Sequence, residues 1–111
     1  MKKFVVTWGS AATDPEGTVS SYCGCHGVYL SRGKALEEMQ TCLEAQKQEA
    51  IESEIEQYFG EPESEEALDY LRRHMVTYGN TIEDYFELDY ETYGGTKVEV
   101  YIRVEEVEIN A

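Results

Sequence analysis

Basic residues are scarce in this sequence. Nine lysines and arginines stand against 23 aspartates and glutamates among 111 residues, which gives a formal net charge of −14. A field of that sign repels phosphate backbones and anionic membranes, so we expect no direct binding to nucleic acid or to a membrane. The same excess of carboxylates attracts cations and basic protein surfaces, and we expect the partner to present a basic protein surface.

Long apolar runs are also missing. No stretch approaches the length that is needed to cross a bilayer, and residues 1–6 show two lysines without a leader-like apolar segment. The three cysteines, Cys23, Cys25 and Cys42, are odd in number and follow no such leader, which favours free thiols in a reducing cytoplasm. We therefore expect a cytoplasmic protein with a single domain over residues 1–111.

Motifs for catalysis and for cofactor binding are absent as well. The sequence contains no nucleophile elbow, phosphate-binding loop, HExxH segment, EF-hand loop or dinucleotide fingerprint. Carboxylates are so numerous that a pair of them does not by itself indicate acid–base chemistry, which needs a pocket that separates two pKa values. We therefore expect a protein that is not an enzyme and that carries no cofactor.

One short segment contains metal-ligand residue types, namely Cys23-Gly24-Cys25-His26. Thiolates and imidazole suit zinc, and Cys42 or His74 could complete a set of four ligands. The spacing differs from the two separated ligand pairs of structural zinc sites, so we favour a glycine-rich turn with partly buried thiols and no metal. Zinc binding at this segment stays the alternative.

The longest periodic segment is predicted to be a helix from Ser31 to Phe59. Apolar residues recur there mostly at steps of three and four, Ser31 is a candidate N-cap, and Gly60 with Pro62 predicts the end. Such a helix would be roughly 40 Å long. Its opposite face would form an acidic ridge, which includes Glu49, Glu52 and Glu56.

The remaining pattern predicts four strands and a second helix. Strands are expected at 3–8 and 18–22, with a loop at 10–17 whose turn is Asp14–Gly17. A second helix is expected from Ser64 to Gly79-Asn80, and further strands at 86–91 and 98–104. The predicted order is ββααββ. We expect an α+β fold, a four-stranded antiparallel sheet with two helices packed on one face, and a wet, acidic opposite face.

Register gives two further predictions for the last two strands. A two-residue loop at Gly94-Gly95 would place carboxylates among core valines, which is costly. A three-residue loop pairs Tyr90 with Val98 and Leu88 with Val100, so we predict that loop, with a glycine in left-handed geometry. The apolar residues have even numbers from Val98 to Val104 but odd numbers at Val107 and Ile109. We therefore predict a bulge or the strand end at Glu105-Glu106.

The predicted hairpin carries a second set of acids. Glu87, Asp89 and Glu91 would stand about 6.8 Å apart along one face of a strand. Tyr85 and Tyr101 are candidate anchors beside them, because tyrosine gives contact area at low entropic cost. The alternative is that most of the nine tyrosines are half-buried structural residues. Whether the hairpin or the helix ridge is the functional surface stays open.

In overall character the chain resembles small acidic anti-defence proteins of phages and mobile elements, of the anti-CRISPR and anti-restriction type. A compact α+β domain, the charge of −14 and the row Glu87-Leu88-Asp89-Tyr90-Glu91 carry this resemblance, without an aligned motif. It implies a non-enzymatic inhibitor whose carboxylates occupy a basic surface of a nucleic-acid-handling protein, such as a CRISPR nuclease. The alternative is a small regulatory or interaction module that uses an apolar sheet edge or a dimer face, and a homodimer stays open.

Overall fold

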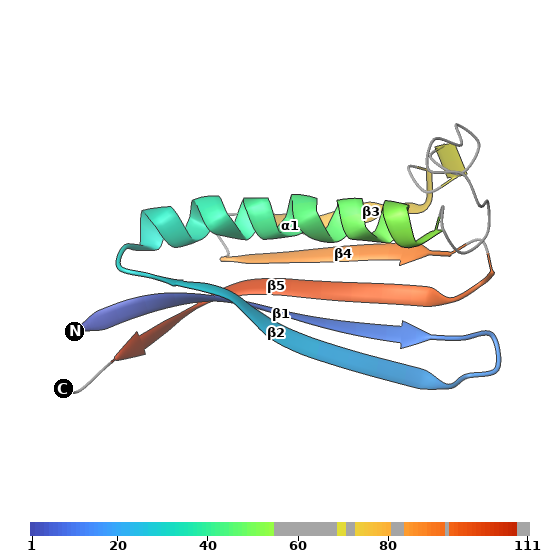
Figure 1. Ribbon diagram of the computed structural model, residues 1–111, viewed down its shortest axis with the longest axis horizontal. Helices are drawn as coiled ribbons and strands as arrows, with labels where there is room; N and C mark the ends of the chain where they lie inside the picture. The colour runs from blue at the N-terminus through green and yellow to red at the C-terminus, as the bar shows by residue number, and fades with distance from the viewer. Residues whose placement is uncertain (55–68, 71–72, 81–83, 93, 109–111) are drawn as a thin grey trace.

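A computed structural model describes residues 1–54, 69–70, 73–80, 84–92 and 94–108. One antiparallel sheet holds five strands in the spatial order β2-β1-β5-β4-β3, and helix α1 lies along one face of it (Figure 1). The first and last strands of the chain are therefore neighbours inside the sheet. In chain order the elements are β1 (Lys2–Thr13), β2 (Val19–Tyr29), α1 (Arg32–Glu54), β3 (Val76–Asn80), β4 (Tyr85–Glu91) and β5 (Lys97–Glu108).

The α+β class is confirmed, but the expected four strands, two helices and order ββααββ are wrong. The described elements follow the order ββαβββ, with five strands and one helix. The difference arises at Val76–Asn80, which we placed at the end of a second helix and which forms the edge strand β3. Val76, Thr77 and Tyr78 are β-branched or aromatic and favour strands. The expected helix residues at 64–68 and 71–72 lie outside the described residues.

Strand β2 is also longer than expected, because the segment that we interpreted as a glycine-rich turn is part of it. Gly24 leaves room for an aromatic ring, since a Cβ there would lie 2.8 Å from the Trp8 side chain. The strand pairing carries one bulge at this segment in place of the predicted turn. Val6 pairs with Gly27 while Thr7 pairs with Cys25, and His26 is the extra residue.

Strand β1 likewise runs beyond its predicted end and includes Ser10–Thr13, which we had assigned to a loop. The predicted turn at Asp14–Gly17 is confirmed. Asp14 Oδ1 accepts hydrogen bonds from the backbone N–H groups of Glu16, at 2.9 Å, and Thr18, at 2.8 Å. Gly17 adopts a φ of 89°, which suits glycine.

Helix α1 begins where Ser31 caps it. The Ser31 Oγ accepts a hydrogen bond from the Lys34 N–H at 3.2 Å, and the Ser31 carbonyl accepts one from the Ala35 N–H at 3.1 Å. The predicted cap is therefore confirmed. The helix is described as far as Glu54, and its predicted end at Phe59 lies outside the described residues.

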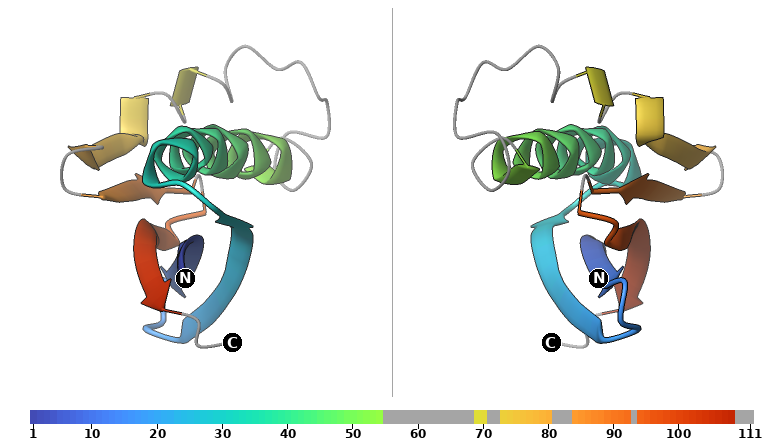
Figure 2. Two further views of the ribbon diagram at one scale, coloured as in Figure 1. Left: turned by 90° about the vertical axis from the view of Figure 1, so that its left-hand side faces the viewer. Right: turned by 90° about the vertical axis from the view of Figure 1, so that its right-hand side faces the viewer.

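The core lies between α1 and the sheet. Met39 and Cys42 of the helix are fully buried against Val6, Leu88 and Ile102 of three neighbouring strands. Burial of each large apolar side chain contributes about 1.5–3 kcal/mol. The views along the helix axis in Figure 2 show α1 on one side of the sheet, and no described element covers the other face.

The register predicted for β4 and β5 is confirmed. Tyr90 pairs with Val98 and Leu88 pairs with Val100. The Thr92 N–H donates to the Thr96 carbonyl at 2.9 Å, so the hairpin closes between two residues that are separated by three positions in the sequence. Within it Gly95 has a φ of 88°, the left-handed glycine that the prediction required.

The bulge or strand end predicted at Glu105-Glu106 is wrong. Strand β5 continues to Glu108, with Glu105 opposite Val5 and Glu106 opposite Phe4, without a register shift. The four residues 105–108 are all exposed. Because neither face of this end is buried, the strand can continue without keeping its apolar side chains on one face.

Candidate functional site

The open face of the sheet, turned away from α1, presents the odd-numbered residues of β4 and β5. Register places Asp89 opposite Glu99 and Glu87 opposite Tyr101 on neighbouring strands. Asp89 and Glu87 are two residues apart on β4 and therefore share this face. We call Glu87, Asp89 and Glu99 the carboxylate cluster.

Two tyrosines donate hydrogen bonds to the carboxylate cluster. The Tyr85 hydroxyl donates to Glu87 Oε1 at 2.9 Å, and the Tyr101 hydroxyl donates to Glu99 Oε2 at 2.5 Å. The two rings stack on each other, with centroids 6.4 Å apart and planes at 25°. Predicted residues Tyr85, Glu87, Asp89 and Tyr101 are thus brought together in one surface.

The electrostatics of the cluster favour an added positive charge. Burial is the largest cause that raises the pKa of Asp89, and together with a hydrogen bond with Glu87 and the charges of Glu87 and Glu99 it brings that pKa to about 6. Asp89 Oδ1 is buried and accepts no hydrogen bond from the described residues. A positive charge placed beside the carboxylate cluster would relieve the repulsion between its members.

The tyrosine hydroxyls remain donors over a wide pH range. Burial and the hydrogen bond to Glu87 raise the pKa of Tyr85 to about 12. The hydrogen bond to Glu99, together with burial, raises the pKa of Tyr101 to about 12. Both phenols therefore stay protonated at neutral pH and hold the neighbouring carboxylates in place.

The observed cluster differs from the predicted acidic row at two residues, Glu91 and Glu99. Glu91 was predicted as part of the acidic row, but it lies opposite the basic residue Lys97, whereas Asp89 lies opposite another acid. Glu99 was not predicted, although it belongs to the cluster. The predicted pairing of Leu88 with Val100 already implied that Asp89 faces Glu99, so this signal was present in the sequence.

The predicted acids of the helix do not join this surface. Glu49 and Glu52 are exposed residues of α1 and lie on the other side of the sheet. Glu52 Oε1 accepts a hydrogen bond from Gln48 Nε2 at 3.1 Å. Glu56 lies outside the described residues. The predicted binding residues therefore divide into two separate surfaces, one on the open face of the sheet and one on the helix.

The alternative of a zinc site at Cys23, Cys25 and His26 is not assembled by the fold. Cys23 and Cys25 line a hollow of about 510 Å³ on the open face, together with Tyr101. The His26 ring instead reaches Glu38 of the helix, with Nε2 and Oε2 3.2 Å apart. Within the described ranges no three His, Cys, Asp or Glu side chains are placed to hold a metal ion.

Comparison with known proteins does not indicate a function for this chain, so its surfaces are the basis for the proposal below. The chain matches no protein-family model, no curated protein and no solved structure. In the part of the chain that the structure describes, no helix has both the length and the apolar character to cross a bilayer.

Proposed function

We propose that this protein is a non-enzymatic acidic inhibitor. The open face of its sheet would bind a basic surface of a nucleic-acid-handling protein and occupy the place of phosphates. The observation that carries the proposal is the carboxylate cluster itself: Glu87, Asp89 and Glu99 crowd together on two neighbouring strands of an uncovered sheet face.

The chemistry of the cluster suits lysine and arginine side chains. Carboxylates accept charge-assisted hydrogen bonds, and a guanidinium can bridge two of their oxygens at once. The stacked rings of Tyr85 and Tyr101 add rigid contact area beside the acids. Residues two apart along β4 repeat their charge at about 6.8 Å, which gives a partner a regular line of acceptors.

Inhibition would follow from occupancy. A protein that handles nucleic acid binds phosphates mainly through lysine and arginine, and that binding supplies much of its affinity. An acidic protein of net charge −14 would be steered to the same residues and would exclude the nucleic acid. A CRISPR nuclease is one partner of this kind, in keeping with the resemblance to anti-defence proteins.

The test is retention of partners from a nuclease-treated lysate at low and at moderate salt. One variant neutralises the cluster (Glu87→Gln, Asp89→Asn, Glu99→Gln), and a matched control removes the same charge elsewhere (Glu16→Gln, Glu37→Gln, Glu44→Gln). Wild type and control should retain basic nucleic-acid-handling proteins at low salt and release them at moderate salt. The cluster variant should not retain them.

Competition then tests inhibition directly. Wild type should displace a labelled oligonucleotide from the retained partner, whereas the cluster variant should displace much less. Equal retention by the two charge-matched variants, with circular dichroism showing both folded, would overturn the proposal.

A second candidate function is an interaction module that uses the outer edge of β2. Residues 19–30 contain no acidic residue, lysine or arginine, which is unusual in so acidic a chain. Four apolar or aromatic side chains along this segment are more than half exposed: Val19, Tyr22, Val28 and Leu30. An exposed edge strand without charges favours pairing with a strand from another chain, including a second copy.

The two candidates respond differently to salt and to mutation. Pairing along β2 should persist at moderate salt, because it depends on backbone hydrogen bonds and apolar contact. Val19→Lys with Val28→Lys should abolish it and leave binding through the carboxylate cluster intact. Sedimentation measurements of wild type and this variant would show whether the second chain is another copy.

A further inference from the structure

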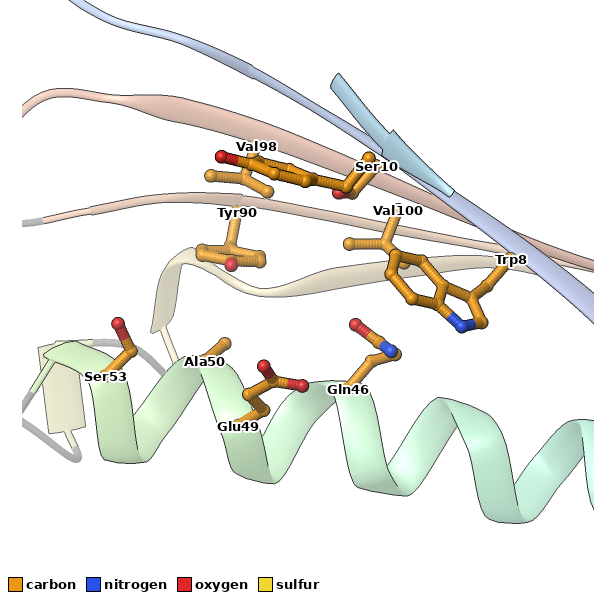
Figure 3. A pocket seen from close by; sticks show the side chains of 10 residues that line it. Trp8, Ser10, Gln46, Glu49, Ala50, Ser53, Tyr90, Val98 and Val100 are labelled. Atoms are coloured by element: carbon orange, nitrogen blue, oxygen red, sulfur yellow. The ribbon is translucent and has the colours of Figure 1, made fainter. Parts of the chain in front are cut away.

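A second hollow lies between α1 and the sheet, on the side of the molecule opposite to the carboxylate cluster (Figure 3). Its volume is about 380 Å³, within the range of small-ligand sites. Val100 and Ala50, both buried, form part of its wall. The other lining residues are Trp8, Ser10, Tyr22, Gln46, Glu49, Ser53, Tyr90 and Val98.

Three aromatic side chains from three strands line this hollow. They are Trp8 of β1, Tyr22 of β2 and Tyr90 of β4, and Trp8 is the only tryptophan in the chain. Tyr22 is 68% exposed and Trp8 is half-buried, so part of the surface of both side chains remains accessible. Aromatic faces carry partial negative charge and attract cations, tryptophan most strongly.

The helix contributes a carboxylate to the same hollow. Figure 3 shows Glu49 projecting from α1 toward the side of the sheet that carries Trp8 and Tyr90. Within the described residues no ion pair engages Glu49, and no lysine or arginine lines the hollow. A carboxylate beside aromatic rings, in a chain of net charge −14, selects a cation and repels an anion.

The lining also indicates which kind of cation fits. A bare ammonium ion needs acceptors for all of its N–H groups when it leaves water. A methylated ammonium group has few or no N–H groups and presents methyl groups that can be buried against rings and against Val98 or Val100. Ser10, Gln46 and Ser53 supply neutral acceptors that suit either group. The rings together with Val98 and Val100 add apolar surface that only methyl groups can cover, and this contact favours the methylated group.

We propose that this hollow binds a methylated ammonium group, of the kind carried by free quaternary amines and by trimethylated lysine side chains. The site uses the helix side of the sheet and does not depend on the function proposed for the open face. Trp8 would report occupancy directly, because the sole tryptophan forms part of the wall.

The test is a titration of the full chain with choline, followed by tryptophan fluorescence and calorimetry. The comparison ligand is the neutral analogue of choline in which carbon replaces the quaternary nitrogen. We expect the cation to bind roughly tenfold more tightly than the analogue, as a cation–π site requires. Peptides with trimethylated or unmodified lysine form a second arm, which separates a protein-borne ligand from a free amine.

Two variants locate the site. Glu49→Gln should weaken choline binding several-fold, whereas Glu44→Gln, an exposed helix residue outside the hollow, should leave it unchanged. Tyr22→Leu should also weaken binding, and its exposed position makes a folding defect easy to exclude by circular dichroism. Equal affinity for choline and its neutral analogue, or no binding of choline and of the trimethylated peptide, would overturn the proposal.

Discussion

Asp89 and Glu99 lie directly opposite each other on β4 and β5, so that two carboxylates face one another across a strand pair. Like charges in this position destabilise a sheet. The chain therefore gives up stability at the surface where we propose that a basic partner binds. If these acids serve binding at the expense of stability, neutralising one of them should raise the free energy of unfolding of the protein.

Asp89→Asn should stabilise the protein at neutral pH by about 1 kcal/mol. This is less than the raised pKa of Asp89 would give by itself, because water partly screens the charges of the cluster. At pH values between the ordinary pKa of 3.8 and the raised pKa of about 6, Asp89 keeps its proton in the folded protein and loses it in the unfolded chain. Where the native state binds more protons, stability falls as pH rises.

Urea denaturation at several pH values checks this prediction. The difference between Asp89→Asn and wild type should be absent below the ordinary pKa of 3.8 and fully developed above about 6. Glu105→Gln, an exposed residue on β5, is the control and should show no such step. A constant difference at all pH values would contradict the electrostatic explanation.

Gly79→Ala should destabilise the protein by about 2 kcal/mol or more. Gly79 has a φ of 89°, and an added Cβ would lie 2.2 Å from the Tyr85 carbonyl oxygen. Gly33→Ala provides the contrast, since nothing lies within 4 Å of its added Cβ and its position is helical. Thermal unfolding should show Gly33→Ala to be neutral or stabilising by roughly 0.5 kcal/mol.

Ser31→Ala should cost about 1 kcal/mol, because it removes the side-chain acceptor of the Lys34 N–H at the start of α1. Ser31→Asp should restore most of that stability, since aspartate also caps helices. Chemical denaturation of wild type, Ser31→Ala and Ser31→Asp compares their free energies of unfolding. If alanine and aspartate behave alike, the hydrogen bond does not stabilise the helix.

The cysteines should react in two classes with a thiol reagent. Cys23 and Cys25 are exposed on β2, whereas Cys42 is buried under the helix, and burial raises its pKa to about 11. Two of the three thiols should therefore be modified in the native protein, and the third only after unfolding. Mass spectrometry of the labelled chain counts them. Labelling of all three at the same rate would place Cys42 outside the core.

The parts of the fold that could be predicted from the sequence are those set by local patterns. The cap at Ser31 and the register that pairs Leu88 with Val100 both follow from residues close together in the chain. The error at Val76–Asn80 has the opposite origin. Apolar residues at helical spacing before it suggested one continuous helix, and pairing with β4 instead selected a strand.

The candidate site divides in the same way. Glu87, Asp89 and the two tyrosines were predictable from strand alternation, and Glu99 could have been deduced from the predicted register. The hollow beside Glu49 could not, since its walls come from four strands and a helix that are brought together only by the crossing of α1 over the sheet. Sequence periodicity shows which face of an element is apolar but not which element covers it.

The middle strand of the sheet, β5, is the last strand of the chain, and this affects the order of folding. The pairs β1-β2 and β3-β4 flank β5 and share no strand pairing with each other. During synthesis each pair can form as soon as it leaves the ribosome, but the two halves cannot join until residues 97–108 emerge. Each half would present an open edge until then. The central seam of the sheet is therefore the last to close, and folding should be slow for so small a chain.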